Sequence, residues 1–153
     1  MKISNKKQTL AFLKKHFIMQ LATSYKDKPA VAVMLYAVDN NFNIYFATHK
    51  DSQKSQNLLK NPNASLSIWE HHSALIQASG VVSVVKDAKE QSKIMDRLAD
   101  AATEDESFWP PVFRIKGDEY IIFKISLSWA RILDLEQDTI RQKDTPFTEL
   151  NFK

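Results

Sequence analysis

The sequence predicts an α+β fold: a small antiparallel barrel of six strands with two or three peripheral helices. Segments rich in β-forming residues follow one another along the chain, separated by turn residues. The run Ala30 to Val38 is apolar on both faces, which is typical of a strand inside a barrel, or between a barrel and a second subunit. A lone glycine, Gly80, interrupts a long strand pattern where a small barrel needs a bulge at a corner.

The first half of the chain alternates helices and strands. Leu10, Leu13 and Phe17 recur at helical spacing and indicate a first helix over Ser4 to His16. Three strand segments follow, separated by the turns KDKP and DNN, and a short helix then runs to NPN. The strand segments are FIMQLATSY, AVAVMLYAV and FNIYFAT, and the helix covers Asp51 to Lys60.

The second half returns to strands. ASLSIWE alternates as a half-buried strand, with Ala64, Leu66 and Ile68 on one face, and LIQASGVVSVV contains Gly80. Asp87 and Glu90 form a capping-box pattern for a helix that ends near Ala102. FWPPVFRI is expected to be irregular because of its two prolines, and EYIIFKIS and WARILDLE supply the final strand segments. The helix stripe facing the barrel is Ile94, Leu98 and Ala101.

Length and composition set the class of protein. The 153 residues are 44% hydrophobic and 25% charged, which favours one globular domain over 1–153, with 137–153 as a peripheral tail. No cysteine is present, which excludes disulfides, thiolate nucleophiles and thiolate metal sites. The net charge is +3, but the lysines are scattered, so we expect no nucleic-acid partner. The N-terminus lacks a signal-peptide pattern and the apolar runs are short, so we expect no membrane partner and a cytoplasmic location.

One strand-to-helix junction contains the candidate residues for binding an anion. In IYFATHKDSQKSQNLLKNP a strand gives way to a helix start, where backbone N–H groups and the helix dipole favour an anion. Thr48 and Ser52 offer hydroxyl groups and Lys54 a positive charge, so the three form a candidate phosphate cradle, with His49 beside it. The alternative is that Asp51 simply caps the helix and its neighbours are surface residues, and both interpretations can hold together.

The same stretch resembles a known family. The order Thr48, then Ser52-Gln53-Lys54, then Asn61-Pro62 and Trp69 is similar to the core of the pyridoxamine 5′-phosphate oxidase-like family, the FMN-binding split β-barrels. The resemblance implies a homodimer with two FMN molecules at the subunit interface. It places the phosphate on Thr48, Ser52 and Lys54. It also places the isoalloxazine ring along the backbone of Val33, Met34, Leu35 and Tyr36.

The partner subunit normally completes such a site. Trp109 is the candidate for that role, with a core aromatic as the alternative. Family members that oxidise pyridoxamine phosphate have arginine and lysine where this chain has Val31 and Tyr36, and a second arginine where it has Gln53.

Two further differences lie later in the chain. A family glutamine is replaced by Leu75, although Gln77 on the same face is a possible substitute. The C-terminal arginine and histidine signature is missing. We therefore expect a divergent member of the family rather than the vitamin B6 oxidase itself.

Three functions stay open at this point. The first is an FMN-dependent oxidoreductase in which the flavin supplies the chemistry and no catalytic side chain can be named. The second is a flavin-binding protein without enzymatic activity. The third is a barrel that binds another ligand, such as haem. The adjacent His71 and His72 indicate a solvated turn, so no metal site is expected.

Overall fold

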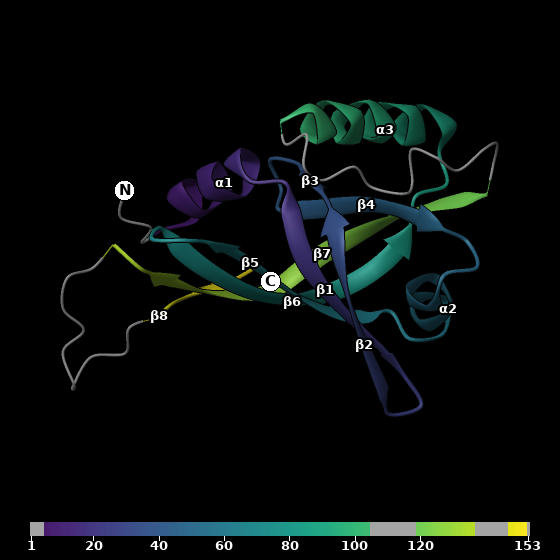
Figure 1. Ribbon diagram of the computed structural model, residues 1–153, viewed down its shortest axis with the longest axis horizontal. Coiled ribbons are helices and arrows are strands. Elements are labelled where there is room, and N and C mark those ends of the chain that lie inside the picture. Colours follow the sequence, from purple (N-terminus) through teal and green to yellow (C-terminus); the bar gives the residue numbers. More distant parts are fainter. Residues whose placement is uncertain (1–4, 105–118, 137–146, 153) are drawn as a thin grey trace.

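The structure is a computed structural model of the chain, and it describes residues 5–104, 119–136 and 147–152. Within these ranges it is an α+β fold with three helices and a single antiparallel sheet of eight strands (Figure 1). The elements are α1 (Lys6–Lys15), β1 (Ile18–Tyr25), β2 (Lys28–Leu35), β3 (Ala37–Val38), β4 (Asn43–His49), α2 (Gln53–Lys60), β5 (Asn63–Glu70), β6 (Ala74–Val84), α3 (Ala88–Thr103), β7 (Tyr120–Asp134) and β8 (Phe147–Asn151).

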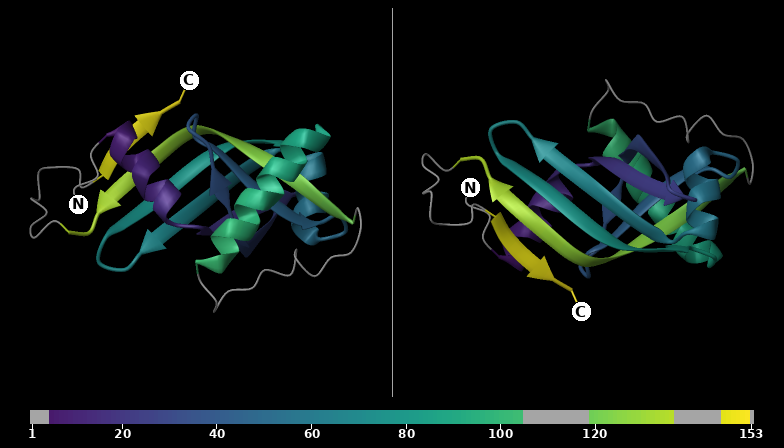
Figure 2. Two further views of the ribbon diagram at one scale, coloured as in Figure 1. Left: turned by 90° about the horizontal axis from the view of Figure 1, so that it is seen from above. Right: turned by 90° about the horizontal axis from the view of Figure 1, so that it is seen from below.

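The sheet runs in the order β2-β1-β5-β6-β7-β4-β3, and β8 pairs with β7. It curls strongly, so that β2 and β4 contact each other although four strands lie between them in the sheet order. Figure 2 shows α1 and α3 on one side of the curled sheet, and α2 beside β1 and β2. This agrees in outline with the expected split barrel.

The curl encloses the main core, which includes Met19, Ile44, Phe46 and Phe123. Helix α1 joins this core through Phe12 and Leu13, both nearly inaccessible to solvent. A second, smaller core lies between α3 and the sheet, where it joins the side chains of Leu35, Tyr45, Ile94, Leu98 and Ile122. The predicted helix stripe is confirmed for Ile94 and Leu98, but Ala102 is buried while Ala101 stays partly exposed.

The described residues form eight strands and not the predicted six, and the strand segments differ from the predicted ones for three physical reasons. The run Ala30 to Val38 breaks at Tyr36 into β2 and β3. EYIIFKIS and WARILDLE form one continuous strand, because Ser126 and Ser128 alternate with buried Ile125 and Leu127 and therefore fit the period of a strand.

The third reason lies in the predicted tail. Residues 137–146 are outside the described ranges, but Phe147–Asn151 form the edge strand β8, in which Leu150 is buried. Lys6 and Phe42 both contact the Phe152 ring, so the end of the chain packs against α1 and the β3–β4 turn. The predicted irregular segment FWPPVFRI lies outside the described residues.

Two local predictions are confirmed. The register of β6 against β7 shifts between Ser79 and Gly80, which is the bulge expected at the glycine. Asp87 caps α3 by accepting a hydrogen bond from the Glu90 N–H at 2.9 Å. None of the helices in the described part of the chain has the length and apolar character of a membrane-spanning segment.

Candidate functional site

The strand-to-helix junction is built around Ser52, which is the N-cap of α2. Its Oγ accepts a hydrogen bond from the Ser55 N–H at 3.2 Å. The alternative interpretation named Asp51 as the cap, and this is wrong, because the cap is Ser52; the Asp51 N–H donates to Nδ1 of His49 at 3.0 Å. The short connection therefore fixes where α2 begins and which way its N-terminus points.

Three hydroxyl groups meet at this N-terminus. Thr48 Oγ1 lies 3.3 Å from Ser52 Oγ, and Ser52 Oγ donates to Ser55 Oγ at 3.1 Å. Ser55 Oγ in turn donates to the His49 carbonyl oxygen at 2.8 Å. Ser55 is fully buried and was not selected in the sequence analysis, although its position three residues after the cap is the signal that predicts its contact with Ser52.

Lys54 lies in the first turn of α2 and is only partly exposed. Burial lowers the pKa of its ammonium group. Among the described residues it has no hydrogen-bond acceptor and no carboxylate partner, and the first turn of α2 contains no acidic residue. A cation at a helix N-terminus is opposed by the macrodipole, so an anion beside Lys54 would be stabilised there, although the exposed carboxylates of Asp51 and Glu119 also lie at this junction.

Strand β2 is an edge strand of the sheet, and the curl of the sheet brings it close to β4. Tyr36 N–H donates to the Phe17 carbonyl at 2.8 Å, so in an antiparallel ladder the N–H and C=O groups of Val33 and Leu35 point away from β1. Met34 packs into the main core and Leu35 into the core under α3. The predicted ring-lining segment thus offers backbone donors and acceptors at a free strand edge.

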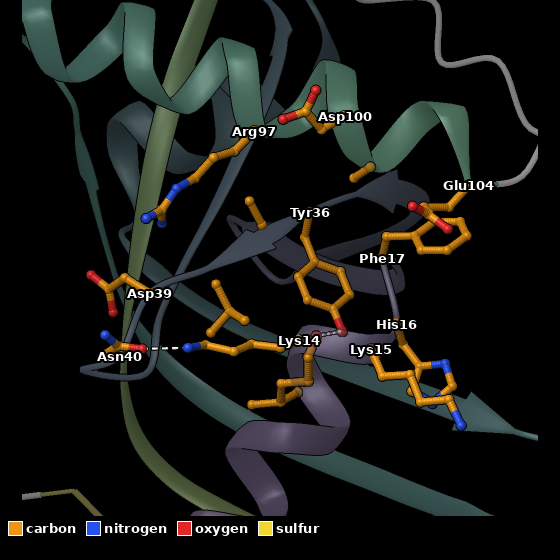
Figure 3. A pocket seen from close by; sticks show the side chains of 14 residues that line it. Lys14, Lys15, His16, Phe17, Tyr36, Asp39, Asn40, Arg97, Asp100 and Glu104 are labelled. Atoms are coloured by element: carbon orange, nitrogen blue, oxygen red, sulfur yellow. Dashed lines mark hydrogen bonds between the residues drawn. The ribbon is translucent and has the colours of Figure 1, made fainter.

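Of the two alternatives for the apolar run Ala30 to Val38, burial of both faces inside the barrel of a single chain is wrong, and burial against a second subunit stays a prediction. Val31 is 73% exposed and Val33 is 52% exposed, so the outward face of β2 is open up to Met34. Tyr36 is buried, and its hydroxyl donates to the Leu13 carbonyl at 2.8 Å (Figure 3). Its side chain therefore links the end of β2 to α1 and does not lie along the free edge of β2.

His49 lies directly beside the hydroxyl cluster. Its Nδ1 accepts from Asp51 N–H, and its Nε2 is 3.4 Å from a Glu119 carboxylate oxygen at the start of β7. Both ring nitrogens thus have protein partners. His49 positions the turn, and contact with an anion would require the Glu119 interaction to give way.

Gln77 lies elsewhere on the molecule. It is on the outward face of β6, where its Oε1 accepts a hydrogen bond from Nε of Arg131 at 2.6 Å. A shallow pocket of ≈ 340 Å³ on this face includes Gln77, Trp129, Arg131 and, across the sheet, Val31. The strand order separates β6 from both β2 and β4, so in one chain Gln77 does not join Thr48, Ser52 and Lys54.

Arg131 and Trp129 were not selected in the sequence analysis. They are two residues apart in one strand and therefore share a face, which is the signal that would have identified them. The guanidinium group of Arg131 lies 4.3 Å from the centre of the Phe147 ring and 5.9 Å from that of Trp129. Trp109 lies outside the described residues.

His71 and His72 are in an exposed turn, as predicted. Their rings are 3.7 Å apart between centroids, so the two side chains lie side by side in this turn. In the described ranges, no three His, Cys, Asp or Glu side chains gather in a way that could hold a metal ion.

The chain was compared with known proteins. A family model described as pyridoxamine 5′-phosphate oxidase matches residues 6–124, well over half of the 153 residues. The chain belongs to this family. The matched range contains α1 to α3 and the first part of β7, and therefore the whole junction between β4 and α2. No curated protein matches the chain.

Solved structures share the fold of the pyridoxamine 5′-phosphate oxidase family at low identity. A conserved hypothetical protein from Mycobacterium tuberculosis is 18% identical with a TM-score of 0.73, over 93% of this chain and 96% of that one. An FAD-binding protein from Mesorhizobium loti is 16% identical with a TM-score of 0.66, over 84% and 93%. A heme binding protein from Mycobacterium smegmatis is 14% identical with a TM-score of 0.68, over 94% of this chain and 55% of that one.

The positions at which the chain departs from the vitamin B6 oxidases of the family have structural roles here. Gln53, in place of an arginine, donates to Asn57 Oδ1 at 2.9 Å, and Asn57 Nδ2 donates to Thr23 Oγ1 at 3.1 Å. This chain of hydrogen bonds holds α2 against β1. Tyr36, in place of a lysine, anchors α1. The chain is therefore a divergent member of the pyridoxamine 5′-phosphate oxidase family.

Proposed function

We propose that the protein binds FMN, with the flavin phosphate at the start of α2. The observation that carries the proposal is Lys54, a partly buried ammonium group with no counter-ion among the described residues, in a first helical turn that contains no acidic side chain. A phosphate there would accept from Lys54, from the Thr48 hydroxyl and from the free N–H groups of the first turn. The donor set thus fits a phosphate ester, and the FAD-binding relative supports a flavin as its carrier.

The remaining parts of the proposed site are backbone groups. The outward-pointing N–H and C=O groups of Val33 and Leu35 would hold the polar edge of the isoalloxazine ring along the free edge of β2. Met34, Leu35 and Tyr36 are each buried in a core, so this edge is rigid. When bound, the flavin supplies the hydride or electron transfer, and the protein fixes its position and excludes water from one side.

We propose that the working unit is a homodimer of split barrels. The outward face of the sheet carries Val31, Val33 and Val81, which are 73%, 52% and 52% exposed, together with Trp69 at 59%. An exposed apolar face of this kind is typical of a protein interface. Gln77 and Arg131 lie on the same face, so a second copy could bring them to a flavin that the first copy binds.

A comparison of FMN with riboflavin tests the phosphate site, because the two differ only in the phosphate. The purified protein, freed of flavin, is titrated with each ligand, and protein or flavin fluorescence reports binding. We expect FMN to bind more tightly than riboflavin. Lys54→Gln should weaken FMN by about 1.5–3 kcal/mol, the range for a charge-assisted hydrogen bond, and leave riboflavin unchanged.

Lys60→Gln is the matched control, since Lys60 lies at the other end of the same helix. It should bind FMN like the unmodified protein. Equal affinity for FMN and riboflavin, or an unchanged affinity in Lys54→Gln, would remove the phosphate from the start of α2.

We propose an oxidoreductase as the activity. The flavin-loaded protein is mixed with a reduced nicotinamide and an electron acceptor, and oxidation of the nicotinamide is followed by absorbance. Turnover that disappears together with FMN in the Lys54→Gln variant supports the enzyme. Retained flavin without turnover for any donor would favour a flavin-binding protein with no enzymatic activity.

A further inference from the structure

A second cavity lies away from the junction, between α1, the turn that joins β3 to β4, and the C-terminal half of α3 (Figure 3). Its volume is ≈ 570 Å³, within the usual range of small-molecule pockets. It shares none of the residues Thr48, His49, Ser52 and Lys54. The base of the cavity is apolar and is made by Leu13, Phe17, Tyr36, Ala37, Val38 and Ala101.

The walls of this cavity are held in place by hydrogen bonds. Tyr36 is buried and its hydroxyl ties the end of β2 to the Leu13 carbonyl of α1. On the turn, Asp39 accepts from the N–H groups of Asn41 and Asn43, from the Asn43 side chain and from the Tyr45 hydroxyl. The cavity is thus a formed feature of the fold, and the Asp39 carboxylate is fully used by the turn.

On the α3 side of the cavity, two carboxylates are placed unfavourably for two electrostatic reasons. Asp100 and Glu104 lie one turn apart on α3, where like charges repel, and both lie at the C-terminal end of the helix, where the dipole is negative. Helices α1 and α2 follow the usual pattern, with Lys14, Lys15 and Lys60 in their last turns, whereas α3 has no basic residue there. Neither acidic side chain forms an ion pair among the described residues, although Arg97, one turn before Asp100 on α3, also lines the cavity.

The opposite wall is basic. Figure 3 shows Lys14 and Lys15 on the α1 side of the cavity and Asp100 and Glu104 on the α3 side. Lys14 donates to Asn40 Oδ1, which leaves two of its three ammonium hydrogens, and Lys15 has no acceptor among the described residues. The lysines of α1 and the carboxylates of α3 line one cavity without pairing with each other, and Arg97 on α3 adds a third cation to the lining.

We propose that this cavity binds a small zwitterion of the ω-amino acid type, in which an apolar body separates an ammonium group from a carboxylate. Asp100 and Glu104 accept from the ammonium group, and Lys14 and Lys15 donate to the carboxylate. The apolar body lies on Phe17 and Tyr36. A ligand of this class places a cation directly beside Asp100 and Glu104, which form no ion pair with a protein group within the described ranges.

Three matched probes test the proposal: 4-(aminomethyl)benzoate, which has both charges, and 4-methylbenzylamine and 4-methylbenzoate, which have one each. Each is titrated into the ¹⁵N-labelled full chain, and amide chemical shifts are followed by NMR. We expect the zwitterion to shift the amides around the cavity, in the last turns of α1 and α3 and in the β3–β4 turn. Each single-charge probe should bind about tenfold more weakly, as expected for the loss of one charge-assisted contact.

Variants assign the contacts. The double variant Asp100→Asn, Glu104→Gln should bind the zwitterion about tenfold more weakly, and it should fold normally because it removes a repulsion. Lys93→Gln, which changes α3 outside the cavity, should bind like the unmodified protein. The proposal is overturned if the zwitterion shifts no amide around the cavity, if one single-charge probe binds as tightly, or if the double variant binds unchanged.

Discussion

Ser52 combines a structural and a proposed binding role at the start of α2. It caps the helix through the Ser55 N–H and lies 3.3 Å from the Thr48 hydroxyl. Aspartate is as good an N-cap as serine, whereas alanine costs about 1 kcal/mol. Ser52→Asp should therefore keep the stability of the protein but expel FMN, because its carboxylate repels the phosphate. Ser52→Ala should lose about 1 kcal/mol of stability.

Thermal denaturation and FMN titration of the two variants separate the roles. A Ser52→Asp protein that is stable and binds FMN normally would show that Ser52 only caps the helix.

His16, at the end of α1, links pH to stability. Burial lowers the pKa of its imidazole below the ordinary value of 6.5; Glu70, 3.4 Å away, acts in the opposite direction and Lys15 adds to the lowering. The native state then binds fewer protons than the unfolded state between the two pKa values. The contribution of His16 therefore weakens the fold as pH falls below 6.5, towards the pKa of the folded state.

Urea unfolding across this pH range measures the effect. His16→Gln should make the stability profile flatter between about pH 7.5 and about pH 5. A variant profile with the same slope as the unmodified protein would show that His16 does not contribute.

Single residues of the junction were only partly predictable from the sequence. The proximity of Thr48, Ser52 and Lys54 follows from a strand that leads directly into a helix. The cap itself does not, because Asp51 and Ser52 are both strong N-cap residues. In the structure the cap is Ser52, whose Oγ accepts from the Ser55 N–H, while the preceding Asp51 N–H donates to Nδ1 of His49.

At the scale of a single strand, the bulge in β6 depends on Gly80. A Cβ atom at this position would lie 2.4 Å from the Ser126 carbonyl oxygen of β7, and a backbone oxygen has little freedom to move. Gly80→Ala should therefore destabilise the protein by about 1–3 kcal/mol, as for overpacking in a core. Ser83→Ala, at an exposed position of the same strand, is the control. Equal urea midpoints for the two variants would contradict this account.

The two ends of α3 respond oppositely to charge. Glu104 caps the C-terminal end, where a cation is preferred, and Glu90 lies in the first turn, where an anion is preferred. Glu104→Lys should stabilise the protein by about 0.3–1 kcal/mol and Glu90→Lys should destabilise it by a similar amount. Thermal unfolding at low salt measures both. Destabilisation by Glu104→Lys would show that the acidic end of α3 is not under electrostatic conflict.

Elements were predicted best where periodicity is local. The alternation in β5 and the capping of α3 are visible in the sequence and agree with the structure. The sequence predicts two strand segments where the structure has the single strand β7, in which Ser126 and Ser128 occupy the more exposed face. Strand β8 is not visible in the local sequence pattern, because its position depends on pairing with β7, which is a contact between distant parts of the chain.

At the scale of the whole molecule, the open face of the sheet determines assembly. Val31→Lys with Val33→Lys would put two charges into the proposed interface, while both positions are exposed in the single chain and should tolerate the change. Sedimentation should show a dimer for the unmodified protein and a folded monomer for the double variant. Lys93→Glu on α3 should remain a dimer. A monomeric unmodified protein would contradict the proposed assembly.

The same variant links assembly to flavin binding. If residues of both copies form the site, the folded monomer should also bind FMN more weakly. The sequence indicated this open face through the apolar run Ala30 to Val38, but not its extent. Gln77, Val81 and Arg131 join it only because β6 and β7 lie in the same curled sheet as β2.

The central claim is that a flavin phosphate binds where β4 gives way to α2. Its most direct test is the visible absorption spectrum of the purified protein, recorded after addition of excess FMN and removal of free flavin. We predict that the two-band flavin spectrum stays with the protein and is lost in Lys54→Gln. A colourless protein that does not retain FMN would contradict the claim and leave the junction as a capped helix start with no role in flavin binding.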